Sequence, residues 1–553
     1  MSNNESFNVL LEDWIPVFYD DGRVCEVSLN NILKDAHKIK TLSDKQPYVK
    51  IAILRLLTAF ISDVYQLENK KERKNLYDKG SFDENLINQY EQNCITKYGA
   101  SFDLFDSKRP FMIFPYDETI DLESTRLPGT YLHLELPSGQ NVVHIVAQRE
   151  CDFKGDTPAQ FLRAVLSRYL YPTANPMKGA NEETGANCYI KSRENDQIIF
   201  KKSYGSMGVN AGNSLSSPVP EYFWPEGNNL FETLVMCMSS IKELGNLPLN
   251  DPPAPWNSAT IPDAKSNKRG DIVSKVSFVS GLTFQSRRIV IASINENKLI
   301  KESYISNGYV NSDTQLWEDP FAARARNRKT QELYYLQGKK NRAMWRDVGN
   351  ITASSDTNSH KKPRVLNSLS NEYQYEKICS VAMLLHEKKA NYEGMLYDDT
   401  LKLPKTYLED GFIGEYLKEK MEIVEESSKC WDRLKRSLLF KNTEEVLGHY
   451  ADEAISKYWE EIHKFLFNET KENKNFLDFV LVNYENDCDG FSEKCDEYFF
   501  SKLKKIVYKI CREQLQNINS WEMLVRVVKQ IYGENGCLNE FNKILKKFRN
   551  KEG

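Results

Sequence analysis

The stretch FNVLLEDWIPVFYDDGRVCEVSLNNILKDAHKI, residues 7–39, decides how the chain begins to fold. Two short apolar segments flank Asp20, Asp21 and Gly22, and an Asp-Gly pair suits a turn that needs a positive φ angle, so the stretch predicts a β-hairpin. Ser28 then predicts a helix start, because its hydroxyl can accept a hydrogen bond from a free N–H of the first turn. Apolar residues at helical spacing continue this helix, namely Leu29, Ile32, Leu33 and Ala36.

The amino-acid sequence of this stretch also resembles that of a known family. NVLLEDWIPV and VSLNNILKDAHKI are similar to the amino-terminal signature of the CasA family, the large subunits of the type I-E CRISPR surveillance complex Cascade. Further segments that resemble the family follow in the family's order, at residues 48–64, 102–105, 109–112, 227–234, 317–320 and 342–347. No single segment is specific, but the amino-terminal block and the ordered set together identify the chain as a member.

Composition limits the class of protein. With 553 residues, the chain exceeds one ordinary domain, and its 29 Tyr and 27 Phe are typical of a globular protein. The formal net charge of −4 excludes a chain that is basic overall, so any contact with nucleic acid must be a local patch. The 11 cysteines form no CxxC pair, and the clustered cysteines of some relatives are missing, so we predict no metal.

Targeting patterns are missing from the sequence. The polar start lacks the charged and then apolar pattern of a secretory signal, and no apolar run approaches the roughly 20 residues of a membrane span. We therefore expect no membrane partner. Dispersed cysteines without an export signal suit a reducing compartment, and we expect a cytoplasmic protein.

Two regions differ in pattern, and together they predict an α+β fold. Residues 1–404 mix strands, helices and turn-rich loops, which predicts a large mixed domain with irregular sheets; the strand candidates are residues 132–136, 198–201, 276–284 and 289–292. Residues 405–553 contain no proline and show apolar residues at helical spacing. This second region predicts an antiparallel four-helix bundle, with later helices at residues 446–466, 476–484, 498–518 and 521–548. The resemblance implies the same plan, with the first domain sensing DNA and docking on the complex.

The resemblance implies a non-catalytic role without a cofactor. CasA proteins bind the double-stranded DNA next to the target sequence and recognise the protospacer-adjacent motif (PAM) there from the minor groove. They help to open the duplex for R-loop formation and expose a surface for a helicase–nuclease that is recruited or fused to another subunit. The implied partners are the other Cascade subunits, the crRNA and the target duplex.

A glycine loop is the first site that the resemblance implies. It matches Gly205, Ser206, Met207 and Gly208, which follow Tyr204. Glycine suits close approach to the groove floor, because no side chain blocks the backbone N–H. Ser206 and Met207 depart from the family pattern, and Met207 could act as an apolar wedge or crowd the groove. The alternative is an ordinary hairpin loop.

Three further elements follow from the same resemblance. The lysine finger falls on Lys301, with Lys298 as the other candidate; a long cation can reach acceptors in the minor groove. The wedge falls on Asn391, which could also be a helix cap. A loop that contacts the guide–target region in relatives matches Asn141 and His144, although a lone histidine is usually structural.

A basic tract interrupts the otherwise acidic chain. It contains Arg324, Arg326, Arg328 and Lys329, and then Lys339, Lys340 and Arg342. Phosphate contact would explain the tract, because neutralised phosphates release their counterions. A solvated arginine-rich loop or a protein interface are the alternatives.

Enzymatic motifs are missing from the sequence. It has no GxxxxGK[ST], HExxH or GxSxG pattern, so we predict that the chain is not an enzyme. A nuclease assembled from distant residues and a scaffold that reads no DNA stay open as alternatives. An EF-hand-like spacing favours an acidic loop between helices over a calcium site, because positions 1 and 12 carry the wrong acids; its members are Glu485, Asp487, Asp489, Gly490 and Asp496.

Overall fold

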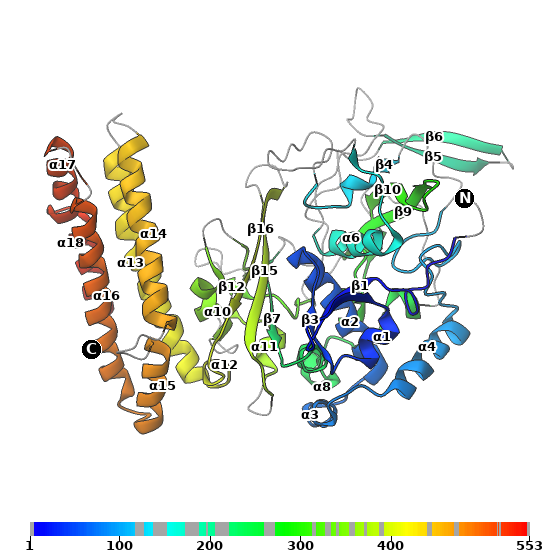
Figure 1. The fold of residues 1–553 in the computed structure, drawn as a ribbon, viewed down its shortest axis with the longest axis horizontal. Helices are drawn as coiled ribbons and strands as arrows, with labels where there is room; N and C mark the ends of the chain where they lie inside the picture. The colour runs from blue at the N-terminus through cyan, green and yellow to red at the C-terminus, as the bar shows by residue number, and fades with distance from the viewer. Residues whose placement is uncertain are drawn as a thin grey trace. The chain divides into compact units, whose positions relative to one another are not determined.

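A computed structural model gives the fold of the chain (Figure 1). The described residues are 5–116, 126–136, 152–171, 187–194, 197–204, 220–258, 271–311, 317–326, 333–338, 342–352, 360–369, 373–385, 392–439, 445–468, 475–516, 518 and 521–549. The chain divides into two compact units, Met1–Met344 with Ser355–Leu403, and Trp345–Ser354 with Pro404–Gly553. The assignment of 1–404 and 405–553 as domains with separate roles stays a prediction.

The amino-terminal hairpin and helix are confirmed. β1 (Ile15–Tyr19) pairs antiparallel with β2 (Val24–Val27), and Gly22 has a φ of +90° in the turn between them. The hydroxyl of Ser28 accepts a hydrogen bond from the backbone N–H of Asn31 at 3.2 Å and caps α1 (Leu29–Lys34). The third strand of this sheet, β3 (Ile39–Leu42), pairs with β1. Local sequence therefore determines this part of the fold.

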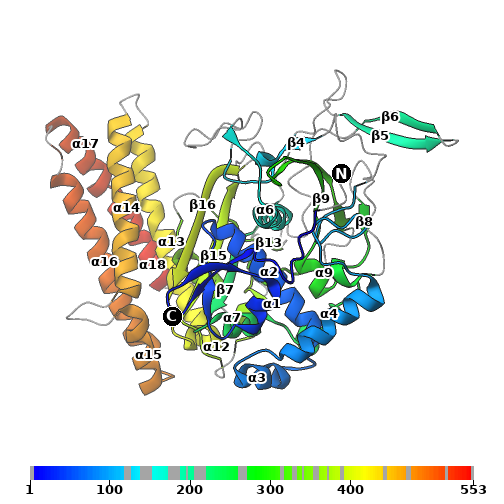
Figure 2. The same ribbon diagram turned by 45° about the vertical axis from the view of Figure 1, so that its right-hand side comes forward.

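Helix α2 (Pro47–Tyr65) is the central helix of the first unit and is buried along nearly its whole length. A helix that is buried on all sides needs partners for its polar side chains. Arg55 Nη1 lies 2.7 Å from Asp319 Oδ1, and Asp63 accepts hydrogen bonds from Tyr90 Oη at 2.5 Å and from two asparagines. Helices α6 (Pro158–Leu170), α7 (Leu230–Cys237) and α9 (Phe278–Leu282) pack against α2 (Figure 2).

The other helices of the first unit surround this core. Their bounds are α3 Lys70–Lys79, α4 Glu84–Tyr98, α6 Pro158–Leu170, α7 Leu230–Cys237, α8 Ile241–Leu244, α9 Phe278–Leu282 and α11 Arg364–Asn367. Helix α3 is capped by Asn69 and ends at Gly80, whose φ of +74° suits a glycine. Most of these helices are short, so tertiary packing rather than helix propensity stabilises them.

The strands of the first unit form small sheets. Their orders are β4-β10-β9, β13-β12-β14 and β16-β15-β7, while β5 pairs with β6 and β8 runs parallel to β11. The bounds are β4 Leu127–Pro128, β5 Asn187–Glu194, β6 Gln197–Tyr204, β7 Tyr222–Glu226, β8 Asp271–Val273, β9 Arg287–Ile294, β10 Ile300–Asn307, β11 Tyr309–Asn311, β12 Arg324–Arg326, β13 Leu333–Tyr335, β14 His360–Lys361, β15 Lys377–Leu385 and β16 Tyr392–Leu401. The prediction of a mixed fold with irregular sheets is confirmed.

Helices make up the second unit. They are α10 Val348–Thr352, α12 Thr406–Glu409, α13 Gly411–Leu439, α14 Glu445–Phe467, α15 Phe476–Asn486, α16 Phe491–Gln516, α17 Trp521–Tyr532 and α18 Cys537–Arg549. Helix α13 packs against α14 and α18, and α14 packs against α16 (Figures 1 and 2). The short helix α10 lies so close to α13 that a Cβ on Gly349 would stand 2.9 Å from the Cα of Lys418.

Three predicted elements are wrong. Residues 132–136 form a turn and a bend rather than a strand. Residues 276–284 contain helix α9 rather than a strand, because the hydroxyl of Ser277 caps that helix and Ser280 reciprocates. Residues 521–548 form two helices rather than one, and α17 is separated from α18 by a turn that contains Gly533 and Gly536. A Cβ on Gly533 would stand 2.4 Å from the carbonyl oxygen of Lys529, so the chain turns where only glycine fits.

Among the described helices, none combines the length and the apolar character that crossing a membrane would require.

Candidate nucleic-acid interface

The exposed side chain of Lys301 stands at a β-bulge in strand β10. Ile300 pairs with Ile294 and Glu302 pairs with Ser293, so Lys301 is the extra residue between two ladder positions. A bulge bends its strand and redirects the side chain of the extra residue. No hydrogen bond or ion pair to the ammonium of Lys301 occurs within the described residues. The structure therefore leaves this lysine available for a ligand.

Lys298, the other candidate for the lysine finger, lies in a different setting. It occupies the turn between β9 and β10 with a φ of +62°, and its ammonium lies 3.5 Å from the carboxylate of Glu5. Its side chain is 73% exposed, so this ion pair is weak. The two lysines thus differ in position, which makes Lys298 a matched control for Lys301.

The predicted glycine loop begins where strand β6 ends. Tyr204 is the last residue of β6 and pairs with Asn187 of β5. Gly205, Ser206, Met207 and Gly208 lie outside the described residues. They do not connect β5 to β6, and β6 does not pair with the next described strand, β7, so no hairpin between described strands has this segment as its loop. The minor-groove role stays a prediction.

Asn391 also lies outside the described residues, between two paired strands. Leu385 at the end of β15 pairs with Tyr392 at the start of β16. Strand β16 begins at the next residue, Tyr392, and both readings of Asn391, as a wedge and as a helix cap, stay predictions. Asn141 and His144 likewise lie outside the described residues, between Leu136 and Asp152, and their role stays a prediction.

The basic tract is partly a strand rather than a loop. Arg324 and Arg326 belong to β12, which pairs with β13 and β14. The guanidinium of Arg324 forms an ion pair with Glu318 and lies 5.8 Å from the ring centroid of Tyr335. Arg324 is therefore neutralised within the chain. The side chain of Arg326 and the whole of Arg328 and Lys329 lie outside the described part of the structure, as do Lys339 and Lys340.

His133, which sequence analysis does not single out, is mostly buried and lies between two carboxylates. His133 Nε2 lies 2.9 Å from both carboxylate oxygens of Asp156, and its Nδ1 lies 3.5 Å from Glu135. Burial alone would lower the pKa of His133, but the hydrogen bonds to these two carboxylates outweigh it and raise the pKa to about 10. Tyr48 donates a hydrogen bond to Glu135. The imidazole is therefore charged at neutral pH.

The EF-hand-like spacing does not bring its acids together around one point. Asp487 Oδ1 accepts a hydrogen bond from the N–H of Gly490 at 3.0 Å in the turn between α15 and α16. Asp496 lies in α16, where it accepts a hydrogen bond from Tyr416 at 2.7 Å and pairs with Lys420 at 2.6 Å. Within the described ranges, no group of three His, Cys, Asp or Glu side chains is placed to hold a metal ion.

Known proteins of similar sequence identify the family. A family model described as CRISPR-associated protein Cse1 (CRISPR_cse1) matches residues 8–512. A curated relative, CRISPR-associated protein CasA/Cse1 of Thermus thermophilus, is 27% identical over 242 residues. That match spans 43% of this chain and 40% of the relative, which is less than half of the relative's length.

Solved structures share the fold over nearly the whole chain. Cse1 of Acidimicrobium ferrooxidans is 16% identical with a TM-score of 0.67, covering 100% of this chain and 99% of that one. Cse1 of Thermobifida fusca is 18% identical with a TM-score of 0.67, covering 98% and 97%. A chain from a CRISPR RNA-guided surveillance complex is 14% identical with a TM-score of 0.60, covering 99% of both chains. The family prediction made from residues 7–39 and the ordered later segments is confirmed, and the chain belongs to the CRISPR-associated protein Cse1 family, also called CasA.

Proposed function

We propose that this chain is the non-catalytic large subunit of a type I-E CRISPR surveillance complex that binds target double-stranded DNA and recognises its PAM. The observation that carries the proposal is the family match over residues 8–512. The shared fold with a chain of a CRISPR RNA-guided surveillance complex supports assembly with other subunits and a crRNA. The curated relative aligns over only part of its length, so its activity and partners enter here as proposals.

Lys301 is the residue that we assign to PAM reading with most structural support. Its exposed ammonium has no partner within the described residues, and the bulge directs it away from the ladder. A lysine in the minor groove can donate to adenine N3 and thymine O2. We propose that Gly205 and Gly208 approach the same groove and that Asn391 enters the opening duplex. Guide–target pairing would then supply the sequence specificity.

Phosphate contacts are assigned to the part of the basic tract that follows Arg324. Because Glu318 already neutralises Arg324, that residue offers less charge to a phosphate than its neighbours do. We propose that Arg326, Arg328 and Lys329 neutralise phosphates of the bound duplex. Such contacts make affinity depend on salt without adding sequence information.

Helix α17 presents a surface that suits another protein subunit. Trp521 is 77% exposed, and three further apolar residues at heptad-like spacing, Val525, Val528 and Tyr532, are 51%, 37% and 50% exposed. Val527 and Ile531 occupy the opposite side and are buried. A contiguous apolar stripe on a surface helix marks a protein interaction site. We propose that this stripe contacts a neighbouring subunit of the complex, and that other surfaces receive the helicase–nuclease.

One reconstitution tests the proposal. The partner subunits and crRNA are assembled with and without this chain, and binding is measured to matched duplexes with a permitted or a scrambled PAM. Tight, PAM-dependent binding that appears only with the chain is expected. If the chain enters the complex but changes neither affinity nor PAM dependence, it is a scaffold that reads no DNA. If it cuts the duplex, it is a nuclease, and the non-catalytic assignment is wrong.

A further inference from the structure

Cationic side chains from five separate segments converge on one hollow in the first unit. The hollow has a volume of about 480 Å³. Its cations are Lys70, Lys242, Arg324, Lys361, Lys362 and Arg364, and its carboxylates are Glu243, Glu318 and Asp319. These residues come from α3, α8, β12, β14, α11 and the loops beside them. The chain as a whole carries a net charge of −4, so this excess of cations is local.

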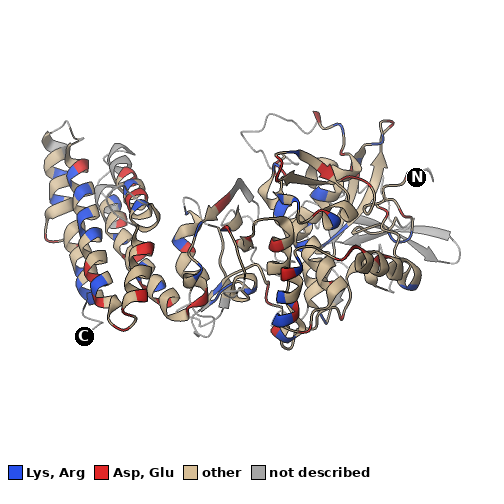
Figure 3. Ribbon diagram, turned by 60° about the horizontal axis from the view of Figure 1, so that its bottom comes forward, with Lys and Arg blue, Asp and Glu red and all other residues tan. Residues whose placement is uncertain are grey.

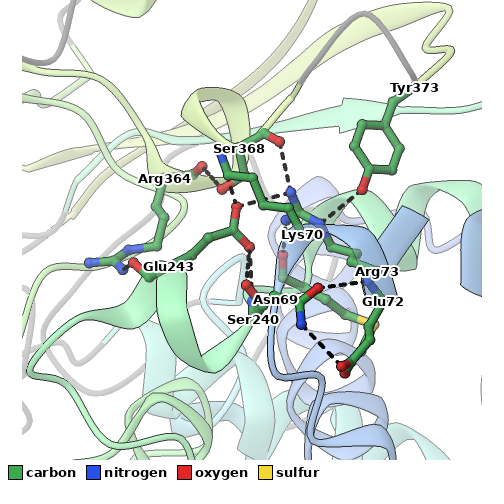
Figure 4. A network of polar contacts seen from close by, with 10 residues as sticks. Asn69, Lys70, Glu72, Arg73, Ser240, Glu243, Arg364, Ser368 and Tyr373 are labelled. Atoms are coloured by element: carbon green, nitrogen blue, oxygen red, sulfur yellow. Dashed lines mark hydrogen bonds and ion pairs between the residues drawn. The ribbon is translucent and has the colours of Figure 1, made fainter. Parts of the chain in front are cut away.

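Two of the three carboxylates are neutralised from the core side of the hollow. Asp319 pairs with Arg55 at 2.7 Å, and the side chains of both are at most 5% exposed. Glu243 pairs with Arg73 at 3.1 Å, and Arg73 is 1% exposed (Figure 4). Neither arginine lines the hollow. These two carboxylates therefore offer little charge to the lysines on the solvent side.

The network around Glu243 is also saturated with hydrogen bonds. Ser240 donates to Glu243 from its backbone N–H at 3.0 Å and from its hydroxyl at 2.7 Å (Figure 4). Arg73 also donates to the carbonyl oxygens of Met238 and Ser368, so its position is fixed from several sides. Lys70 lies 4.0 Å from Glu243, at the limit of an ion pair, and is 66% exposed. The wall of the hollow is thus rigid, while Lys70 stays available.

The remaining carboxylate is shared between two cations. Glu318 pairs with Arg324 and, at 2.6 Å, with Lys361. Burial raises the pKa of Glu318, but these cations outweigh that effect and lower it, so the carboxylate is charged at neutral pH. Lys242 has no hydrogen bond or ion pair to its ammonium within the described part of the chain. Arg364 donates to the carbonyl oxygen of Glu243 at 2.7 Å, which does not neutralise it.

We propose that this hollow binds phosphate groups of a nucleic-acid backbone, with Lys70, Lys242 and Arg364 as the contacting cations. The six cations in the lining outnumber its three carboxylates, so they repel one another, and a polyanion relieves this repulsion. The lining contains no aromatic side chain on which a base could stack, so a free nucleotide would gain little beyond its phosphates. A continuous backbone, with one charge on every nucleotide, fits cations on several walls.

The assignment of DNA as the ligand rests on the proposed function, since the bound nucleic acid is taken to be the target duplex. Figure 3 shows lysine and arginine positions next to aspartate and glutamate positions along the helices of the first unit. Electrostatic attraction to a whole face of this unit would therefore be weak. A local hollow with saturated carboxylates binds phosphates where such a mixed surface does not.

The test is the double charge reversal Lys70→Glu/Lys242→Glu in the assembled complex. Lys71→Glu is the matched control, because Lys71 lies beside Lys70 in the first turn of α3 but does not line the hollow. Binding to duplexes with a scrambled PAM is measured between roughly 50 and 200 mM salt. The slope of the logarithm of the binding constant against the logarithm of the salt concentration should be shallower by about 2 in the double variant. Across that range, its affinity should therefore fall about tenfold less than that of the wild type.

The other outcomes are distinct. An unchanged slope in the double variant, or an equal change in Lys71→Glu, overturns the proposal. A loss confined to single-stranded RNA of the crRNA sequence, with duplex binding intact, overturns the assignment of DNA. The neutral variant Lys70→Gln/Lys242→Gln, with an unchanged thermal midpoint, excludes misfolding as the cause. Absence of PAM dependence in the wild-type complex would refute the proposed function, while the salt slope on scrambled duplexes still tests the hollow.

Discussion

Replacing His133 by glutamine should remove a pH-dependent part of the stability of the first unit. In the wild type the imidazole is buried between Asp156 and Glu135 and has a pKa of about 10, against 6.5 in an unfolded chain. A pKa raised by folding stabilises the protein fully below the unfolded value and loses this effect as the pH rises through the folded value. The relevant window is therefore pH 6.5 to about 10.

The magnitude follows from the two pKa values. Proton linkage gives a contribution of about 4 kcal/mol at pH 7 and about 1 kcal/mol at pH 9. The side chain of His133 is only 15% exposed, so solvent screening reduces these values little. Glutamine keeps one hydrogen-bond donor for Asp156 but carries no charge. The destabilisation that the variant shows should thus shrink by about 3 kcal/mol between pH 7 and pH 9.

Native-state hydrogen exchange is the suitable assay, because a chain of two units does not unfold in one step. Protection of peptides from α2 and α6 is compared between wild type and variant at each pH, which cancels the pH dependence of intrinsic exchange. Two carboxylates left without their cation add a cost at both pH values. If the difference between the two proteins is the same at pH 7 and pH 9, packing rather than charge explains the role of His133, and the linkage argument is refuted.

Three other substitutions test separate features. Lys301→Ala should weaken binding to a PAM-containing duplex more than binding to a pre-opened target, while Lys298→Ala leaves both unchanged; equal losses in a binding titration count against minor-groove reading. Trp521→Asp should lower incorporation into the complex in size-exclusion chromatography without changing the circular dichroism of the chain, because the side chain is 77% exposed. Arg55→Met should destabilise the first unit by about 3–5 kcal/mol in denaturant unfolding, because it removes one partner of a buried ion pair; Asp319→Asn in the same background should recover part of the loss.

Sequence predicted the elements whose causes are local. The hairpin of β1 and β2 depends on Gly22, and α1 depends on the cap of Ser28, so a short window contained all the information. The prediction of a strand at residues 276–284 is wrong because the apolar residues there are compatible with a helix as well as with a strand. The helix forms because Ser277 caps its first turn. In the same way, a helical pattern continues across Gly533, and only the backbone geometry of that glycine ends α17.

The candidate site was less predictable, for a physical reason. Family order restricts the search for a lysine finger to a short segment that contains Lys301, and that role stays a prediction, whereas the bulge at Lys301 depends on the register with β9. Lys70 and Arg364 line the same hollow although they are far apart in the sequence. No local sequence pattern indicates that two such residues come together in the fold. The neutralisation of Asp319 by Arg55 is likewise a long-range pairing. Sequence analysis therefore identified the family and one exposed lysine. Which charges on a surface are neutralised by ion pairs could be read only from the structure.

Helix α10 packs against α13 although it precedes α13 by about sixty residues, and this affects how the chain folds during synthesis. When these residues leave the ribosome, the helix against which Gly349 packs has not yet been made. The second unit can therefore complete its core only late in translation. A fragment that starts at residue 405 would lack α10, and a fragment that ends at 404 would carry the apolar side chains of Val348 and Ile351 without their cover. Expression of either half alone should therefore yield an aggregation-prone product, and α10 and α13 should be kept on the same polypeptide.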